Sequence, residues 1–234
     1  MDDNSFLGSI NPQVLNGKDR LPPRQRDSTL LKTSQNIFWS ESQVTREQRW
    51  ARNGHNGFIV WLTGLSGSGK STLARVIEHE LFARGLNAFI LDGDNLRHGL
   101  NSNLGFSPVD RSENIRRAAE AGSLMASAGH VAVIALISPY LQDRLAAREI
   151  SLARGLEFVE VYVDAPLQVC EQRDPKNLYQ RARAGEIRDL TGIGAPYEPP
   201  ENPEIHVRTD ELSIKDCLEL ILRNLLPRLP LERR

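Results

Sequence analysis

The segment 64–71 (GLSGSGKS) constrains the fold of this chain more than any other stretch. It follows the apolar run 58–62 and precedes residues 72–77, whose apolar side chains have helical spacing. Glycines between a strand and a helix let successive backbone N–H groups turn inward on an anion, and the helix N-terminus adds free donors and a positive dipole end. The segment therefore predicts a loop that holds the phosphates of a nucleoside triphosphate.

Within this loop, each residue type has a defined task. Lys70 is placed to reach the β- and γ-phosphates as a point charge, and the hydroxyl of Ser71 is placed to bind Mg²⁺. The alternative is a chance glycine-rich turn, which the strand before it and the helix after it argue against. The predicted nucleotide-binding residues are Gly64, Leu65, Ser66, Gly67, Ser68, Gly69, Lys70, Ser71 and Thr72.

The composition excludes several classes of protein. The chain has 234 residues, 25% of them charged, and a net charge of −1, which suits one large domain and a tail and gives no global basic excess for binding nucleic acid. No apolar run approaches the roughly 20 residues of a membrane span. The N-terminus lacks a signal-peptide pattern, and Cys170 and Cys217 form no paired motif, so we expect a cytoplasmic protein with reduced thiols.

The chain divides into three parts on its sequence pattern. Residues 1–35 are polar and proline-containing, and we expect a disordered or loosely packed tail. Residues 36–56 form an N-terminal arm with a short helix that Thr45 caps and Gly54 ends; the arm packs on the main domain or on a partner subunit. The main domain is expected over residues 57–230.

Within the main domain, short apolar runs alternate with amphipathic stretches. The runs lack polar alternation, as strands of a parallel sheet do when both faces are buried. The pattern predicts an α/β fold with a parallel five-stranded sheet flanked by helices. Expected strands are 58–63, 87–92, 131–137, 157–163 and 204–208, and expected helices are 70–84, 110–128, 140–154, 166–173 and 213–227.

Because ligands bind beyond the carboxyl ends of such strands, the residues just after each strand are the candidate site. Asp92 and Asp94 end the second strand and are candidates to bind Mg²⁺ or to accept a substrate proton, with Gly93 allowing a sharp turn between them. The alternative is that one of them only caps the next helix.

The stretch 104–117 suggests a second ligand. Phe106 lies in a loop, where a nucleobase can stack on it, while Arg111 and Asn114 share one face of the following helix and can reach one ligand together. The alternative is a solvated helix beside a loop phenylalanine that is buried.

Ser138 follows the third buried strand and precedes Pro139. A Ser-Pro pair is a good helix N-cap and first-turn pair, so capping explains it fully. Its position at a strand end beside the phosphate loop keeps a catalytic or ligand-binding role open.

The segment of about 174–200 is rich in glycine and in positive charge. It predicts a basic lid over the phosphates, which neutralises charge and excludes water, against the alternative of an ordinary solvated loop. The cations here are Arg173, Lys176, Arg181, Arg183 and Arg188.

Taken together, these segments resemble the adenylyl-sulfate kinase (APS kinase) family, in order along residues 57–227. The resemblance implies the P-loop NTPase fold. The matching segments are 64–72 (GLSGSGKST), 91–95 (LDGDN), 99–101 (GLN), 104–108 (LGFSP), 110–111 (DR), 113–117 (ENIRR), 137–140 (ISPY), 170–175 (CEQRDP) and 181–187 (RARAGEI).

The resemblance implies a reaction. ATP, with Mg²⁺, phosphorylates the ribose 3′-hydroxyl of adenosine 5′-phosphosulfate, giving 3′-phosphoadenosine 5′-phosphosulfate and ADP in sulfate assimilation. It also implies a homodimer that binds these nucleotides. Lys70, Asp94 and Ser138 are then the catalytic residues, Ser138 as a candidate phosphoserine, and Ser71, Asp92 and Asp94 the metal-binding ones.

The same resemblance assigns the two nucleotides to residues. Arg173 and Thr209 lie against the ATP adenine, and Phe106 stacks on the adenine of the acceptor. The implied acceptor-binding residues are Asp94, Arg97, Phe106, Arg111, Asn114, Ile137, Ser138 and Lys176.

The lid departs from the family pattern at two positions. Leu190 stands where the family often has phenylalanine, so it can cover the acceptor adenine but not stack on it, at a cost of about 1 kcal/mol. Gly194 stands where aspartate is usual, and Arg208, outside the lid, replaces a common aspartate or lysine. These changes concern substrate affinity and lid order, not the reaction.

Two other functions compete with this interpretation. One is a kinase of the same fold for another small alcohol or nucleotide, which Phe106, Arg111 and Asn114 argue against. The other is a non-catalytic scaffold subunit that docks on a sulfate adenylyltransferase through the N-terminal arm, which the intact Lys70 and Ser71 argue against.

Overall fold

The computed structural model describes residues 38, 40 and 42–229. The predicted tail over 1–35 lies outside the described residues, as do most of residues 36–41. The described residues from Ser42 onward belong to one compact unit.

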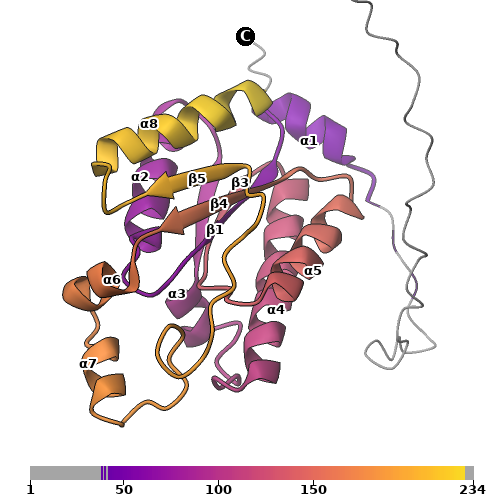
Figure 1. Ribbon diagram of the computed structural model, residues 1–234. Helices are drawn as coiled ribbons and strands as arrows, with labels where there is room; N and C mark the ends of the chain where they lie inside the picture. Colours follow the sequence, from indigo (N-terminus) through magenta and orange to yellow (C-terminus); the bar gives the residue numbers. More distant parts are fainter. Residues whose placement is uncertain (1–37, 39, 41, 230–234) are drawn as a thin grey trace, which may run out of the picture. The chain divides into compact units, whose positions relative to one another are not determined.

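The centre of the fold is a parallel sheet of five strands in the order β2-β3-β1-β4-β5 (Figure 1). Its strands are β1 (Phe58–Thr63), β2 (Ala88–Asp92), β3 (Val131–Ala135), β4 (Phe158–Asp164) and β5 (Ile205–Arg208). β1 lies between β3 and β4, so the strand that leads into the phosphate loop is central. Every residue of β1 and β3 is buried, which explains why their sequences show no polar alternation.

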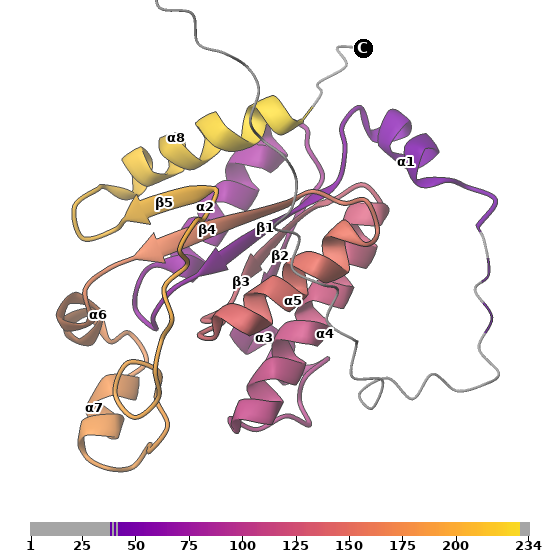
Figure 2. The same ribbon diagram turned by 45° about the vertical axis from the view of Figure 1, so that its right-hand side comes forward.

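Helices cover both faces of this sheet (Figures 1 and 2). The helices are α1 (Arg46–Asn53), α2 (Lys70–Ala83), α3 (Gly93–His98), α4 (Pro108–Ser127), α5 (Leu141–Leu152), α6 (Leu167–Arg173), α7 (Leu178–Arg183) and α8 (Ile214–Leu225). The sequence predicted these except α3 and α7, which are six residues each and too short to show a periodic pattern.

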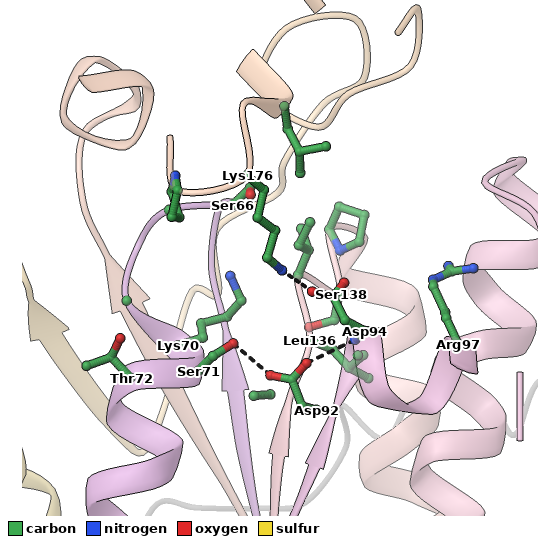
Figure 3. A pocket seen from close by; sticks show the side chains of 18 of the residues that line it. Ser66, Lys70, Ser71, Thr72, Asp92, Asp94, Arg97, Leu136, Ser138 and Lys176 are labelled. Carbon is green, nitrogen blue, oxygen red and sulfur yellow. Dashed lines mark hydrogen bonds and ion pairs between the residues drawn. The ribbon is translucent and has the colours of Figure 1, made fainter. Parts of the chain in front are cut away.

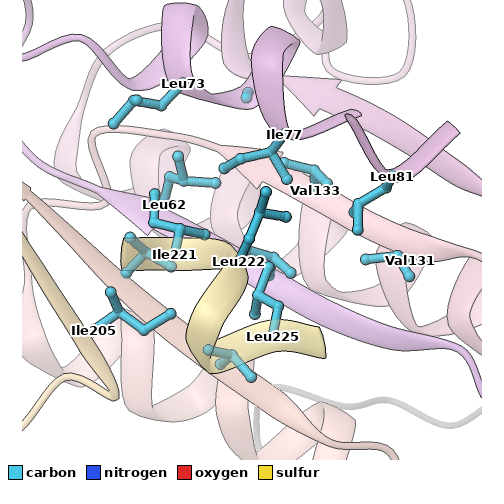
Figure 4. Packing of buried hydrophobic residues seen from close by; sticks show 14 of the residues in the cluster. Leu62, Leu73, Ile77, Leu81, Val131, Val133, Ile205, Ile221, Leu222 and Leu225 are labelled. Carbon is cyan, nitrogen blue, oxygen red and sulfur yellow. The ribbon is translucent and has the colours of Figure 1, made fainter. Parts of the chain in front are cut away.

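On one face, α2 and α8 pack their apolar side chains against alternate residues of the strands. The two helices and the strands share one apolar core (Figure 4). It contains Leu73, Ile77 and Leu81 of α2, Leu62 of β1, Val131 and Val133 of β3, and Ile221 and Leu225 of α8. This core fixes the start of α2, and therefore the phosphate loop, relative to the strand ends.

On the other face, α4 and α5 cover the sheet. Ile59 and Trp61 of β1 pack with Ile134, Ile115 and Phe158, and the Trp61 and Phe158 rings stack with centroids 5.6 Å apart. Since Trp61 reaches this face next to the end of β1, its indole lies close to the loop that follows β3.

The described part of the arm packs on this same unit. α1 begins at a capping box of Thr45 and Gln48 and ends at Gly54 in the left-handed conformation. Trp50 Nε1 donates to the carbonyl of Ala126 at 3.0 Å, and Arg46 donates to the carbonyl of Arg154. These contacts lie at the ends of α4 and α5 that are remote from the phosphate loop.

Candidate active site

A cavity of about 1380 Å³ opens at the carboxyl ends of the strands. Its walls come from segments far apart in the sequence: the phosphate loop, the start of α3, the start of α4, the residues after β3, and the segment between α6 and β5 (Figure 3). The cavity is therefore where a parallel sheet is expected to bind ligands.

The phosphate loop occupies one side of this cavity. Gly67 has a φ of 76°, and a Cβ at this position would lie 2.8 Å from the carbonyl oxygen of Cys170. Gly64 has a φ of 150°, and a Cβ there would lie 2.2 Å from the carbonyl oxygen of Val163. Both positions require glycine, because a side chain would meet backbone that cannot move away.

Lys70 lies buried beneath the loop. Its Nζ donates to the carbonyls of Gly64 at 2.9 Å and Leu65 at 2.6 Å. Burial strips water from the ammonium group and lowers its pKa to about 8. The lysine is thus held by neutral backbone oxygens, which anionic phosphates can replace.

Ser71 and Asp92 lie beside Lys70, and Asp94 follows Asp92 at the start of α3 (Figure 3). Ser71 Oγ donates to Asp92 Oδ2 at 2.7 Å, and Asp92 Oδ1 accepts from the backbone N–H of Asp94 at 3.0 Å. Asp92 is thereby the N-cap of α3. It both caps this helix, as the alternative stated, and contacts Ser71 of the phosphate loop. Among the described residues no cluster of three or more acidic, histidine or cysteine side chains suits a metal ion.

Gly93 lies where the chain turns from β2 into α3, as predicted, but this turn does not use a conformation that only glycine favours. Gly93 is the first residue of α3 and lies outside the left-handed region. A Cβ here would lie 2.7 Å from Leu136 Cδ2, so the glycine serves the close packing of α3 on the end of β3.

Asp94 and Lys176 face each other across the cavity and form an ion pair (Figure 3). Asp94 comes from α3, whereas Lys176 comes from the segment after α6. Since both side chains are about half exposed, ligands can reach and separate them.

Phe106 is exposed to 65%, so the alternative of a buried loop phenylalanine is wrong. The guanidinium carbon of Arg97 lies 4.4 Å from the centre of its ring, at cation–π distance. Arg97 is held there by the carbonyl of Gly105, to which it donates at 2.8 Å. The ring is therefore oriented by its neighbours and open to a ligand.

Arg111 and Asn114 both line the cavity, as the helical spacing predicted. Asn114 is buried, and its Oδ1 accepts from Asn101 at 3.0 Å. Arg111 donates to the carbonyl of Asp189 at 2.7 Å and to Thr191 Oγ1 at 3.2 Å, so it already connects α4 to the lid segment.

The alternative in which Ser138 and Pro139 begin the next helix is wrong. α5 starts at Leu141 with Tyr140 as its N-cap, and its first free N–H donates to the carboxylate of Glu198 at 2.7 Å. Ser138 lies before the helix, is only 2% exposed, and accepts from Trp61 Nε1 at 3.1 Å. Since Ser138 does not cap the helix, its position on the cavity wall is consistent with a role in binding a ligand.

Arg173 and Thr209 lie together beside residues 67 and 68 of the phosphate loop. Arg173 donates to Thr209 Oγ1 at 3.0 Å and to the carbonyl of Gly67 at 3.3 Å. Thr209 Oγ1 donates to the carbonyl of Ser68 at 2.7 Å. These bonds place both side chains beside the loop.

The predicted lid segment packs on the loop by an apolar cluster of its own. Leu190, only 7% exposed, packs with Tyr179, Ala182 and Cys170, and Tyr179 donates to the carbonyl of Ser66 at 2.9 Å. Of the five predicted lid cations, Arg173, Lys176, Arg181 and Arg188 line the cavity, whereas Arg183 pairs with Glu171 outside it.

A model of the family "Adenylylsulphate kinase" matches residues 56–208. The chain belongs to this family. An adenylyl-sulfate kinase of Staphylococcus carnosus (strain TM300) is 55% identical over 192 residues, covering 82% of this chain and 96% of the relative.

Two solved structures extend the comparison. The Mycobacterium tuberculosis APS kinase CysC, in complex with AMPPNP and APS, is 48% identical with a TM-score of 0.71 and covers 73% of this chain and 98% of that one. The hexameric APS kinase of Thiobacillus denitrificans is 33% identical with a TM-score of 0.59 and covers 78% of this chain and 31% of that one.

Family membership confirms the predicted P-loop kinase fold and makes the chain an ATP-dependent adenylyl-sulfate kinase. It argues against both competing functions, the kinase for another alcohol and the non-catalytic scaffold. Within the described residues, no helix is long and apolar enough to cross a membrane.

Sequence reasoning missed two residues that shape the adenylyl-sulfate kinase site. Trp61 stands in an apolar run that predicts only a buried strand, yet its N–H holds Ser138. Glu198 caps α5 from a loop 57 positions away. A buried tryptophan requires a partner for its N–H, which was the available signal for Trp61; nothing local signals Glu198.

Proposed function

We propose that this chain transfers the γ-phosphate of ATP to the ribose 3′-hydroxyl of adenosine 5′-phosphosulfate. The observation that carries the proposal is the shared cavity. The phosphate loop lines one side, Phe106, Arg111 and Asn114 line another, and Asp94 and Ser138 line the same cavity. The related M. tuberculosis structure contains AMPPNP together with APS, a pair of ligands that such a cavity suits.

The donor nucleotide takes the loop side. The amides of residues 64–72 and Lys70 bind the β- and γ-phosphates, which replace the carbonyls that now hold Lys70. Arg173 and Thr209 lie against the adenine, since their hydrogen bonds to the carbonyls of Gly67 and Ser68 place them beside the loop.

Mg²⁺ fits the oxygen groups at the start of α2 and α3. Ser71 Oγ and Asp92 Oδ2 are 2.7 Å apart, and oxygen ligands from one hydroxyl and one or two carboxylates suit this ion when phosphates complete its shell. We propose Ser71 and Asp92 as the residues that hold it, while Asp94, the third metal-binding residue that the resemblance implied, is proposed below as the proton acceptor instead. When bound, the ion neutralises charge on the transferring phosphate.

The acceptor nucleotide takes the α3–α4 side. Its adenine stacks on the open face of Phe106, with Leu190 as the apolar cover, and Arg111 and Asn114 reach the same ligand through an ionic and an amide contact. Arg97 supports Phe106 from behind, and the remaining proposed contacts are Ile137, Ser138 and Lys176.

Asp94 is the proposed proton acceptor. As the 3′-oxygen bonds to the γ-phosphorus, the bond from that phosphorus to the ADP oxygen breaks and the hydroxyl proton passes to the Asp94 carboxylate. Lys176 leaves Asp94 for the phosphates, which frees the carboxylate. This in-line transfer needs no covalent serine, so Ser138 positions the acceptor, and its phosphorylation stays a prediction from the resemblance.

A coupled assay of ADP release, with and without adenosine 5′-phosphosulfate, tests the reaction. Lys70→Ala should abolish acceptor-dependent release while the protein stays folded. Lys215→Ala is the matched control, because Lys215 is 83% exposed and pairs only weakly with Glu219. Turnover near the wild-type rate in Lys70→Ala would refute the assignment, and nucleotide binding without turnover in the wild type would support the scaffold alternative.

We also propose a cytoplasmic homo-oligomer, with the homodimer as its smallest form. The T. denitrificans relative is hexameric, which supports an assembly of several copies. Light scattering after gel filtration measures the assembly, and co-elution with a sulfate adenylyltransferase tests the partner inferred from the resemblance.

A further inference from the structure

Arg144 of α5 is buried between three segments that surround the site. It is 2% exposed, and its Nε donates to Glu160 Oε1 of β4 at 2.9 Å. One terminal nitrogen donates to the carbonyl of Ser138 at 2.8 Å, and the other to the carbonyl of Glu198 at 2.7 Å. All three nitrogens of one planar guanidinium are therefore used in different directions.

The first target, Ser138, has an unusual backbone. Its φ of 40° is in the left-handed region, which is strained for a residue with a side chain and persists only where surrounding contacts impose it. Its carbonyl accepts from Arg144 and, at 3.4 Å, from Thr63, while its hydroxyl accepts from Trp61. Arg144 supplies the shortest contact that holds this conformation.

The second target is the stem by which the lid returns to the sheet. Tyr197 and Glu198 form this stem at the end of the lid segment; Glu198 N–H donates to the carbonyl of Pro139 at 2.8 Å, and the Tyr197 hydroxyl bonds to Thr63 Oγ1 at 3.0 Å. The Arg144 guanidinium carbon lies 5.8 Å from the centre of the Tyr197 ring. The stem and the Ser138 loop thus share one anchor.

We propose that Arg144 is a positioning residue that fixes the Ser138 loop and the lid stem in one arrangement. The inference rests on the proposed function, in which Ser138 contacts the acceptor and the lid covers it. Ser138 and Pro139 line the cavity and Arg144 is not among the described lining residues, so it acts through them. Its three hydrogen-bond acceptors belong to Glu160, Ser138 and Glu198, and none of these residues is in the phosphate loop on the donor side.

A contribution to stability does not by itself explain why an arginine is buried at position 144. A buried ion pair can often be replaced by apolar residues of similar size at little or no cost in stability, whereas removal of one partner leaves a buried charge. The fork of arginine reaches three acceptors at once, which the single ammonium of lysine cannot do in the same geometry. The three hydrogen bonds of Arg144 therefore fit a residue that positions the Ser138 loop and the lid stem.

Three variants test the proposal on the full chain. Arg144→Lys keeps the charge and loses the fork. The double variant Arg144→Met with Glu160→Leu removes both charges of this ion pair and leaves Arg148 paired with Glu204. Arg148→Lys is the matched control: one turn along α5, Arg148 pairs with Glu204 and Glu160 and bonds neither Ser138 nor Glu198.

We expect Arg144→Lys and the double variant to raise the KM for adenosine 5′-phosphosulfate about tenfold, the size of one lost hydrogen bond to a charged group. The KM for ATP should stay within about twofold, and Arg148→Lys should leave both values within about twofold. Tryptic cleavage after Arg188 should accelerate in the Arg144 variants and not in Arg148→Lys.

The outcomes are distinguishable. A wild-type protein without acceptor-dependent ADP release would overturn the proposed function, while the cleavage rates would still test the stem. A double variant that keeps the wild-type KM for the acceptor and the wild-type cleavage rate would overturn the positioning role. Equal rises in both KM values would do the same, since they would indicate a general loss of structure.

Discussion

Replacement of Phe106 by leucine is the sharpest test of the acceptor site. The ring is 65% exposed and touches Arg97 on one face at 4.4 Å, so it contributes little to the folded core. We expect the free energy of unfolding to change by no more than about 0.5 kcal/mol, as for other exposed positions. A larger effect of this substitution on ligand binding must therefore come from a lost contact with the ligand and not from a loss of folding.

The expected loss in binding comes from stacking. A base on an aromatic ring contributes about 1–3 kcal/mol. Leucine retains some apolar contact but has no π face, so the loss should lie in the lower part of this range, about 1–2 kcal/mol. This corresponds to a rise of about 5- to 30-fold in the Kd of adenosine 5′-phosphosulfate.

Isothermal titration measures this Kd, with a non-hydrolysable ATP analogue as the second ligand. Phe82→Leu is the matched control, because Phe82 is 73% exposed near the end of α2 and is not among the described residues that line the cavity. An unchanged Kd in Phe106→Leu, or equal changes in both variants, would refute a stacking role for Phe106.

Single contacts give three further predictions. Lys70 has a pKa of about 8 in the free protein and binds phosphates in its charged form, so the Kd for ATP should rise as the pH increases from 7 to 9; a flat profile by titration would contradict this. Ser138→Ala should lower the melting temperature, because it leaves the Trp61 N–H unpaired, yet keep measurable turnover; complete loss of turnover with wild-type binding of both nucleotides would favour a phosphoserine intermediate. Gly194→Ala should open the lid and raise the KM for the acceptor, since the new Cβ would lie 1.8 Å from the carbonyl oxygen of Arg188, and an unchanged KM would show that this loop conformation is not required.

The parts of the fold that local sequence encodes were predictable. β1 and β3 are short runs of apolar residues, and the phosphate loop combines glycine, lysine and serine at fixed spacing. Arg111 and Asn114 were placed correctly because the period of a helix decides which residues share a face. In each case the information lies within a few residues.

The predictions that failed concern residues whose roles depend on contacts between distant segments. Ser138 and Pro139 have the local pattern of a helix start, yet Glu198 supplies the cap and Ser138 bonds to Trp61, 77 positions away. Gly93 lies at the change from β2 to α3, as its sequence predicted, but that a Cβ there would crowd the side chain of Leu136 is visible only in the tertiary packing. A local pattern identifies what a residue can do, whereas tertiary packing decides what it does.

The charges in the cavity support a single mechanism for the two proposed nucleotide sites. In this structure Lys70 is bonded to backbone carbonyls, and Lys176 is paired with Asp94. ATP brings phosphates that attract both lysines more strongly than a neutral carbonyl or one exposed carboxylate does. In the proposed mechanism, their movement to the phosphates separates Lys176 from the Asp94 carboxylate, to which the acceptor hydroxyl gives its proton. The donor thereby prepares the base that acts on the acceptor, and the lid that carries Lys176 connects the two events.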